Sequence, residues 1–369
     1  MSLRKIFLTA FVVIALIGSS GSYSWAYASD RLLPVMTRNM DEATDFGPIF
    51  SATTFSQFAT EVANAYLEVQ ASNIPERSAA IADEIAARKP YLVGLQEVSI
   101  WRTGPLFGHA DTETFNALRS LLDALEARGQ HYAVIAMLKE FEGEAPSALG
   151  IEIGFADLDV VLARTDLSVS ELKVSNIQAQ HFVTNLMFPS PILGLVTIPR
   201  GWISVDGKLR GKEFRFVTTH LESFHPGVQA LQAVELVQNA SNTELPVIIA
   251  GDLNTAPLES FGFPGCPPPG GSPALNPAYQ IVIGAGFSDA WSILHPSDPG
   301  FTWPMHCEDP FTPFTTPDQR LDLVLFRDGR KGLGALTADL IGNNPSDLTS
   351  SGLWPSDHAG LASVFKLEP

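Results

Sequence analysis

The chain has 369 residues, of which 45% are hydrophobic and 17% are charged, and its formal net charge at pH 7 is −17. A chain this acidic does not attract polyanions through its general field, and no run of Lys and Arg supplies a local basic track for nucleic acid. A chain of this length can bury a sizeable core, and a cluster of carboxylates that binds cations would explain part of the acidity.

The first residues have the pattern of a secretory signal peptide. Arg4 and Lys5 precede a run over Ile6–Ile17 that is apolar apart from Thr9, and Ala26-Tyr27-Ala28 forms a cleavage site of the small-x-small type. The run is shorter than the roughly 20 apolar residues that a membrane span needs. We therefore expect residues 1–28 to be removed and the mature protein to be secreted, periplasmic or extracellular. A retained N-terminal anchor is the alternative.

The remainder, residues 29–369, reads as one domain, because it contains no Ser/Gly-rich linker and no internal repeat. Three segments read as insertions, near residues 185–202, 256–278 and 295–319. The two cysteines, Cys266 and Cys307, lie in the second and third of these. In an exported protein they are expected to form one disulfide, with two buried free thiols as the alternative.

Apolar, β-branched runs alternate with helical patterns along the first half of the chain. The expected elements are a strand at Leu32–Thr37, helices at Phe55–Gln70 and Glu76–Arg88, a strand at Tyr91–Gln96, a helix at Glu113–Arg128, and strands at His131–Leu138 and Leu158–Arg164, with an acidic loop at Glu140–Gly150.

The second half continues the alternation, and its strands mostly alternate apolar and polar residues, which favours antiparallel pairing. The expected elements are strands at Val169–Phe182, Leu195–Val205 and Glu213–Thr219, a helix at Gly227–Ala240, a buried strand at Leu245–Ala250, and strands at Leu321–Phe326, Leu336–Ile341 and Gly360–Phe365.

Polar side chains stand at the ends of these strands. Asn39, Glu97, His220, Asp252 and Asn254 follow strands, whereas Asp322, Asp357 and His358 stand at or just before the start of later ones. The end of one strand lies beside the start of its antiparallel neighbour, so all of these groups can gather on one rim. Carboxylates buried there need a compensating cation or proton. Oxygen ligands favour a hard cation, namely Mg²⁺, Mn²⁺ or Ca²⁺.

Five motifs occur in the order and rough spacing of the endonuclease/exonuclease/phosphatase superfamily, and the chain resembles that family from about residue 35 to residue 367. The motifs are Gly94-Leu95-Gln96-Glu97-Val98, Thr219-His220-Leu221-Glu222, Gly251-Asp252-Leu253-Asn254, Arg320-Leu321-Asp322 and Ser356-Asp357-His358. The resemblance implies an α/β (α+β) fold, a four-layered α/β-β/α sandwich of two packed mixed β-sheets flanked by helices. It also implies a metal-dependent hydrolase of phosphoric esters.

The resemblance further implies a division of roles. Glu97 is then the principal metal ligand, helped by Asn39 and Asp357. His220 donates a hydrogen bond to the scissile phosphate, Asp252 orients or deprotonates the attacking water, and Asn254 holds the phosphate or that water. Asp322 pairs with His358, and His358 contacts a non-bridging phosphate oxygen. Such groups would neutralise charge that builds on the phosphoryl oxygens.

Simpler structural explanations also exist for several of these residues. Asp252 with Asn254, and Asn39 with its neighbours, are also typical of turns that end a strand. Asp45 is close enough in sequence to reach the same rim. Arg164 and Trp303 are candidates for contacting substrate, but a surface arginine at a strand end and a packed tryptophan explain them equally simply.

Family motifs define chemistry rather than substrate. The acidic charge favours a small-molecule or lipid-borne phosphate ester, with an extracellular deoxyribonuclease-like endonuclease as the alternative. A catalytically silent binding module of the same fold is a further alternative, although every motif residue is present. The apolar segment Asn185–Trp202 resembles the hairpin that contacts lipid in sphingomyelinase-like members, which would give this protein transient membrane contact. The favoured interpretation is a strand pair that packs on the body of the protein.

Overall fold

The computed structural model describes residues 31–257, 277–306, 317–329 and 332–368. Residues 1–28, which the sequence predicts to be a signal peptide, and both cysteines, Cys266 and Cys307, lie outside these ranges, so export and the disulfide stay predictions. Among the described residues, no helix combines the length and apolar character needed to cross a membrane.

Two large mixed sheets and one small hairpin make up the β structure. The first sheet has the order β15-β16-β1-β2-β6-β3-β4, with β5 also paired to β6. Its strands are β1 Leu32–Asn39, β2 Leu92–Gln96, β3 Ile100–Pro105, β4 Thr112–Asn116, β5 Tyr132–Pro146, β6 Ile151–Arg164, β15 Leu333–Ile341 and β16 Gly360–Leu367.

The second sheet has the order β13-β14-β12-β11-β10-β7. Its strands are β7 Leu172–His181, β10 Gly201–Leu209, β11 Lys212–His220, β12 Val247–Asp252, β13 Ser288–Asp289 and β14 Asp322–Arg327. The separate hairpin consists of β8 Leu186–Ser190 and β9 Gly194–Ile198.

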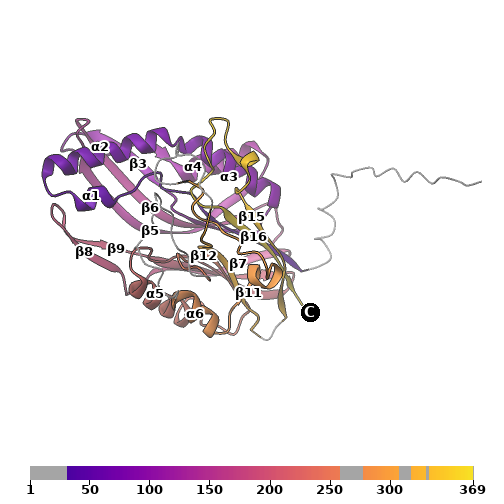
Figure 1. Ribbon diagram of the computed structural model, residues 1–369. Coiled ribbons are helices and arrows are strands. Elements are labelled where there is room, and N and C mark those ends of the chain that lie inside the picture. The colour runs from indigo at the N-terminus through magenta and orange to yellow at the C-terminus, as the bar shows by residue number, and fades with distance from the viewer. Residues whose placement is uncertain (1–30, 258–276, 307–316, 330–331, 369) are drawn as a thin grey trace, which may run out of the picture.

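Helices cover the outer faces of both sheets (Figure 1). The helices are α1 Gly47–Ser51, α2 Phe55–Ala71, α3 Ile74–Arg88, α4 Ala117–Ala127, α5 Pro226–Gln238, α6 Pro277–Gly284 and α7 Ala290–Leu294, with a short 3₁₀ helix, η2, at Pro345–Asp347. The side chains of α2, α3 and α4 pack on the first sheet, and those of α5 and α6 pack on the second. A third apolar cluster, including Leu33, Phe214 and Phe365, fills the space between the sheets. The predicted four-layered sandwich is therefore confirmed.

Parallel pairing in each sheet brings chemically important strand ends together. β1 runs parallel to β2, with Asn39 opposite Gln96, and β11 runs parallel to β12, with His220 opposite Asp252. β14 is antiparallel to β12 and places Asp322 opposite Asp252. The helices that connect the parallel strands lie on the outer faces, which leaves these ends open to one another.

The two sheets approach each other closely beneath these strand ends. A Cβ atom on Gly94 of β2 would lie 2.3 Å from Thr218 Oγ1 of β11, so only glycine fits there. In the same region Gln96 Nε2 donates a hydrogen bond of 2.8 Å to Thr218 Oγ1. This close contact is what lets residues from both sheets share one site.

Several sequence-based boundaries are wrong. The expected acidic loop at Glu140–Gly150 is mostly strand, because β5 runs on to Pro146 in a long hairpin with β6. Residues 112–116, at the start of the expected helix Glu113–Arg128, form β4. Segment 185–202 does contain the expected strand pair, β8–β9, and contacts the body of the protein through Phe188, but it pairs in a sheet of its own and leaves Met187 and Leu195 exposed.

Candidate active site

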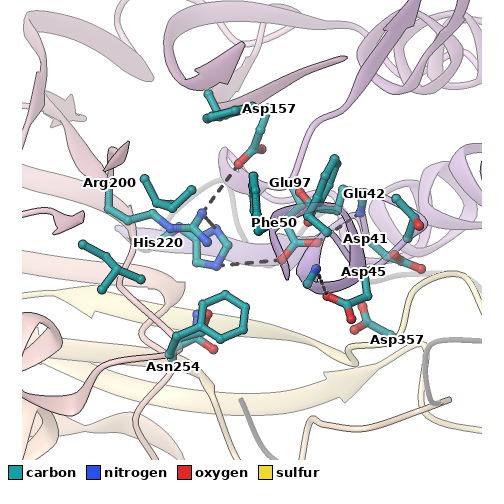
Figure 2. Close-up of a pocket in the computed structure, with 18 of the residues that line it drawn as sticks. Asp41, Glu42, Asp45, Phe50, Glu97, Asp157, Arg200, His220, Asn254 and Asp357 are labelled. Carbon is teal, nitrogen blue, oxygen red and sulfur yellow. Dashed lines mark hydrogen bonds and ion pairs between the residues drawn. The ribbon is translucent and has the colours of Figure 1, made fainter. Parts of the chain in front are cut away.

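A cavity of about 840 Å³ opens where the strand ends of both sheets converge (Figure 2). It is lined by Glu97, His220, Asp252, Asn254, Asp357, His358 and Trp303, all of them expected from the sequence. Asn39 and Asp322 lie directly behind this lining and hydrogen-bond to it. Asp45 also lines the cavity, as its place in the sequence suggested.

Asn39 links two of the acidic groups. Its Nδ2 donates to Glu97 Oε1 at 2.8 Å and to Asp252 Oδ2 at 3.1 Å, and its Oδ1 accepts the backbone N–H of Asp41 at 2.8 Å. The backbone N–H of Glu42 holds the other Glu97 oxygen at 3.1 Å. Both polar atoms of the Asn39 side chain thereby take part in hydrogen bonds, which fixes the two carboxylates relative to each other.

Two site residues have left-handed backbone conformations. Glu97 has φ 55° and Asn254 has φ 48°. A glutamate with positive φ is uncommon, and such strain concentrates at functional sites. At both positions it turns the chain immediately after a buried strand, so that the polar group faces the cavity rather than the core.

Asp252 is the central carboxylate. Its Oδ1 accepts the backbone N–H of Asn254 at 2.9 Å, and its Oδ2 lies 3.6 Å from His220 Nε2 and 3.7 Å from His358 Nε2. Burial raises the pKa of Asp252 to about 6, although the charge of His358 opposes that shift. A carboxyl group with this pKa is well suited to accept a proton from water near neutral pH.

Asp322 and His358 form a buried pair. His358 Nδ1 lies 2.8 Å from Asp322 Oδ2. Burial alone would lower the pKa of His358, but the charges of Asp322, Asp357 and Asp252 outweigh it and raise that pKa well above its usual range. The imidazole is therefore held as a cation beside the cavity, with Nε2 available for a phosphate oxygen.

Arg200 and Asp157 complete the site and were missed by the sequence reading. Arg200 Nη1 lies 2.8 Å from His220 Nδ1 and 3.5 Å from Asp157 Oδ2 (Figure 2). Burial and then the charge of Arg200 hold the pKa of His220 well below its usual range. No motif marks either residue; only the pairing of Gly201 with His220 in the second sheet reveals that Arg200 is adjacent.

The structure places the two residues that were expected to contact substrate, Trp303 and Arg164, in different parts of the molecule. Trp303 forms part of the cavity wall and donates through Nε1 to Asp357 Oδ2 at 3.2 Å, so the tryptophan positions a metal-ligand candidate. Arg164 lies at the opposite end of β6, beyond the pairing of Leu92 with Ala163, and is bound to Asp166. Its position outside the cavity does not support the expected substrate contact, and Arg200 is the arginine that the cavity contains.

The oxygen-rich donor set fits a divalent cation. Glu97 and Asp252 carboxylate oxygens and His220 Nε2 lie within 4.8 Å of one another, and Asp252, Asp322 and His358 form a second such group. Burial and then the charge of Asp357 raise the pKa of Glu97 to about 8, so a bound cation would favour the ionised form of Glu97 at neutral pH. Glu97, Asn39 and Asp357 are the residues that would hold the ion.

Apolar side chains form a hydrophobic wall that shares the cavity lining with the acidic groups. Phe46 and Phe50 come from the segment before and within α1, and Leu186, Phe188 and Ile198 come from the hairpin β8–β9. The rings of Phe50 and Phe188 meet edge to face with centroids 5.4 Å apart. The hairpin thus forms one side of the cavity, while Met187 and Leu195 are 61% and 71% exposed.

The raised pKa values predict how pH affects stability in the absence of metal. Glu97 and Asp252 keep their protons in the folded chain at pH values where the unfolded side chains, with pKa values of about 4.3 and 3.9, have lost them. The native state then binds more protons, so the free energy of unfolding is expected to fall as pH rises from about 4 to about 8. Thermal unfolding in EDTA measures this effect.

Mg²⁺ is expected to restore stability at the upper end of that range, because a bound cation takes the place of the protons. Glu97→Gln should flatten the pH dependence in EDTA. A melting temperature that rises with pH across this window in EDTA would contradict the assignment of these two carboxyl groups.

Comparisons with known proteins find a matching family and a curated relative. The model of the endonuclease/exonuclease/phosphatase family matches residues 63–358. Tyrosyl-DNA phosphodiesterase 2 of Rattus norvegicus is 28% identical over 167 residues, 44% of this chain, and the match spans only 40% of that protein's length.

Solved structures share the fold across most of the chain. A family protein from Leptotrichia buccalis superposes with a TM-score of 0.54 and 15% identity, covering 91% of this chain and 100% of that one. One from Bacteroides vulgatus gives a TM-score of 0.52 and 14% identity, covering 91% and 99%. The matched family model spans all five sequence motifs, from Gly94 to His358, and the chain belongs to the endonuclease/exonuclease/phosphatase family of metal-dependent phosphoester hydrolases.

Proposed function

We propose that this protein is an exported, Mg²⁺-dependent phosphoesterase that hydrolyses a small or lipid-borne phosphate ester with water activated by Asp252. The observation that carries the proposal is the arrangement of Asp252 between two imidazoles and Asn39, in a cavity whose lining also includes an apolar wall. A bound divalent ion would add positive charge at the phosphoryl oxygens and favour a hydroxide-like water.

The residues of the chain divide the chemistry as follows. Asp252 accepts a proton from the attacking water, because its pKa of about 6 places it largely in the carboxylate form at neutral pH. His358, held cationic by Asp322, donates Nε2–H to the developing charge on the phosphoryl group. Asn39 keeps Glu97 and Asp252 at a fixed separation.

The apolar wall supports a substrate with an apolar substituent rather than a polynucleotide. Phe50, Leu186 and Phe188 can bury such a group beside the phosphate, whereas the many carboxyl groups of the same cavity disfavour a substrate with further phosphates. The net charge of −17 also disfavours a polynucleotide substrate. Membrane contact by the hairpin stays a prediction, consistent with its exposed apolar side chains.

A substrate panel tests the proposal. Bis-p-nitrophenyl phosphate, sphingomyelin, a sugar phosphate and plasmid DNA would each be incubated with Mg²⁺, Ca²⁺ or EDTA. We expect hydrolysis of the aryl or lipid ester with Mg²⁺ and none with EDTA. Phe188→Ala should raise KM for the apolar ester about 10-fold, because roughly 1.5 kcal/mol of apolar burial is lost.

Met187→Ala is the matched control, because Met187 neighbours Phe188 on β8 but is not part of the cavity lining and is exposed. Its KM should match that of the unaltered protein. Equal KM changes in both variants would argue that the hairpin acts only through general stability.

An exported endonuclease is the second candidate, and the names of relatives favour it. One relative is a tyrosyl-DNA phosphodiesterase, and a similar solved structure, that of TDP2 from D. rerio, is a complex with a single-stranded DNA product. Efficient plasmid digestion, with no turnover of the small esters, would establish this alternative. A silent binding module would show no turnover of any substrate in the panel.

A further inference from the structure

We infer that Arg200 is a positioning residue that fixes the proton of His220 on Nε2, so that His220 donates a hydrogen bond into the site and does not ligate a metal ion. The inference deepens the proposed function. The proton position itself, however, can be observed without any substrate.

The contact between the two side chains determines the tautomer. Arg200 Nη1 lies 2.8 Å from His220 Nδ1, and His220 is only 1% exposed. A guanidinium group has only donors and is not deprotonated in proteins, so Nδ1 must be the acceptor. A neutral imidazole with a bare Nδ1 carries its single proton on Nε2.

The backbone holds Arg200 in place on both sides of its Cα atom. Its N–H donates to Asn185 Oδ1 at 2.9 Å, and its carbonyl accepts the N–H of Phe182 at 2.8 Å. The next residue, Gly201, pairs with His220 across β10 and β11. From the other sheet, Asp157 Oδ2 lies 3.5 Å from Nη1 and compensates the buried positive charge.

The proton position decides between two roles for His220. Nε2 lies 3.6 Å from Asp252 Oδ2 and 3.8 Å from Glu97 Oε1, a spacing that would otherwise allow all three residues to share a cation. A protonated Nε2 has no lone pair to give to a metal. It presents a hydrogen-bond donor between the two carboxylates, where a phosphate oxygen can accept it.

The two imidazoles beside Asp252 therefore have opposite neighbours. Nδ1 of His220 faces the cation of Arg200, whereas Nδ1 of His358 faces the carboxylate of Asp322. Nδ1 of His220 therefore accepts a hydrogen bond, whereas Nδ1 of His358 donates one to the carboxylate. The two histidines thus differ in whether Nδ1 carries a proton.

Nuclear magnetic resonance tests the inference directly. The protein would be labelled with ¹⁵N-histidine, and long-range ¹H–¹⁵N correlations recorded with and without Mg²⁺; His220→Gln identifies the His220 signals. We expect Nδ1 at the position of an unprotonated acceptor and Nε2 at that of a protonated nitrogen, in both conditions. A proton on Nδ1, or a loss of the Nε2 proton when Mg²⁺ is added, would overturn the inference.

Substitution of Arg200 provides a second test of the inference. In Arg200→Met both tautomers should appear, and kcat should fall about 10- to 100-fold with little change in KM, as for other groups that orient a functional side chain. Arg200→Lys retains a donor-only group and should recover the Nε2–H signals and part of kcat. Unchanged His220 signals in Arg200→Met would refute the role of Arg200.

Arg215→Met is the matched control. Arg215 is a buried arginine on β11, five residues before His220, and its Nε is paired with Asp206 at 2.6 Å. Its loss should lower the melting temperature but leave the His220 tautomer and kcat unaltered. If the tautomer signals are as expected but no phosphate ester is hydrolysed, the inference holds and the proposed function fails.

Discussion

Asp252→Asn is expected to lower kcat by about 10²- to 10⁴-fold, the usual contribution of a positioned general base. Asn keeps the shape of the side chain and can accept the N–H of Asn254, but it cannot take a proton from water. The fold should be retained, and the metal-free variant should be at least as stable at pH 7, because a buried carboxylate with a raised pKa has been removed. Steady-state kinetics on the best ester of the panel and thermal unfolding measure both effects.

Asp206→Asn is the control for this substitution. Asp206 binds Arg215 through two oxygens at the far end of the second sheet, at 2.6 and 3.1 Å. Its replacement should reduce stability and leave kcat intact. Full activity in Asp252→Asn would show that another group activates the water.

Asp322→Asn and His358→Gln are each expected to lower kcat/KM by about 10²- to 10³-fold, as for loss of one stabilising donor at the reacting centre. Asp322 acts only through His358, because its Oδ2 is bonded to Nδ1 and the residue is fully buried. The double variant should therefore lose little more than the worse single variant. A double-mutant cycle measures this coupling.

Strictly additive losses would show that the two residues act independently. The kinetics of Asp322→Asn should also shift toward lower pH, because His358 loses the neighbouring charge that raises its pKa. An unchanged pH profile would argue against a cationic His358 in the unaltered protein.

The sequence predicted those residues of the candidate site that short local patterns mark. Glu97 follows the buried strand β2, His220 and Asp252 are the last residues of β11 and β12, and short motifs mark where these strands end. Parallel pairing then forces the ends together, since parallel strands share an edge of the sheet. Apolar runs of this kind are readable from sequence because burial on both faces selects apolar residues throughout the strand.

The long hairpin β5–β6 shows where local patterns fail. Residues 140–146 are acidic and contain a glycine, which is typical of a loop, yet they continue β5 by pairing along β6. Two register shifts interrupt this ladder, at Val134/Ala136 and Lys139/Phe141, and break the alternation that would reveal a strand. Cross-strand pairing therefore overrode local propensity there.

The sequence by itself determined the family, the four-layered sandwich and the identity of the polar groups at the strand ends, because these depend on local burial patterns and short motifs. Only the tertiary structure decided which arginine enters the cavity, which face of the hairpin forms its apolar wall, and how His220 differs from His358. Arg200 is 20 residues from His220 along the chain, and the two side chains meet only because β10 and β11 pair in one register. Such contacts depend on strand register and on how closely two sheets pack, which no single segment of the chain encodes.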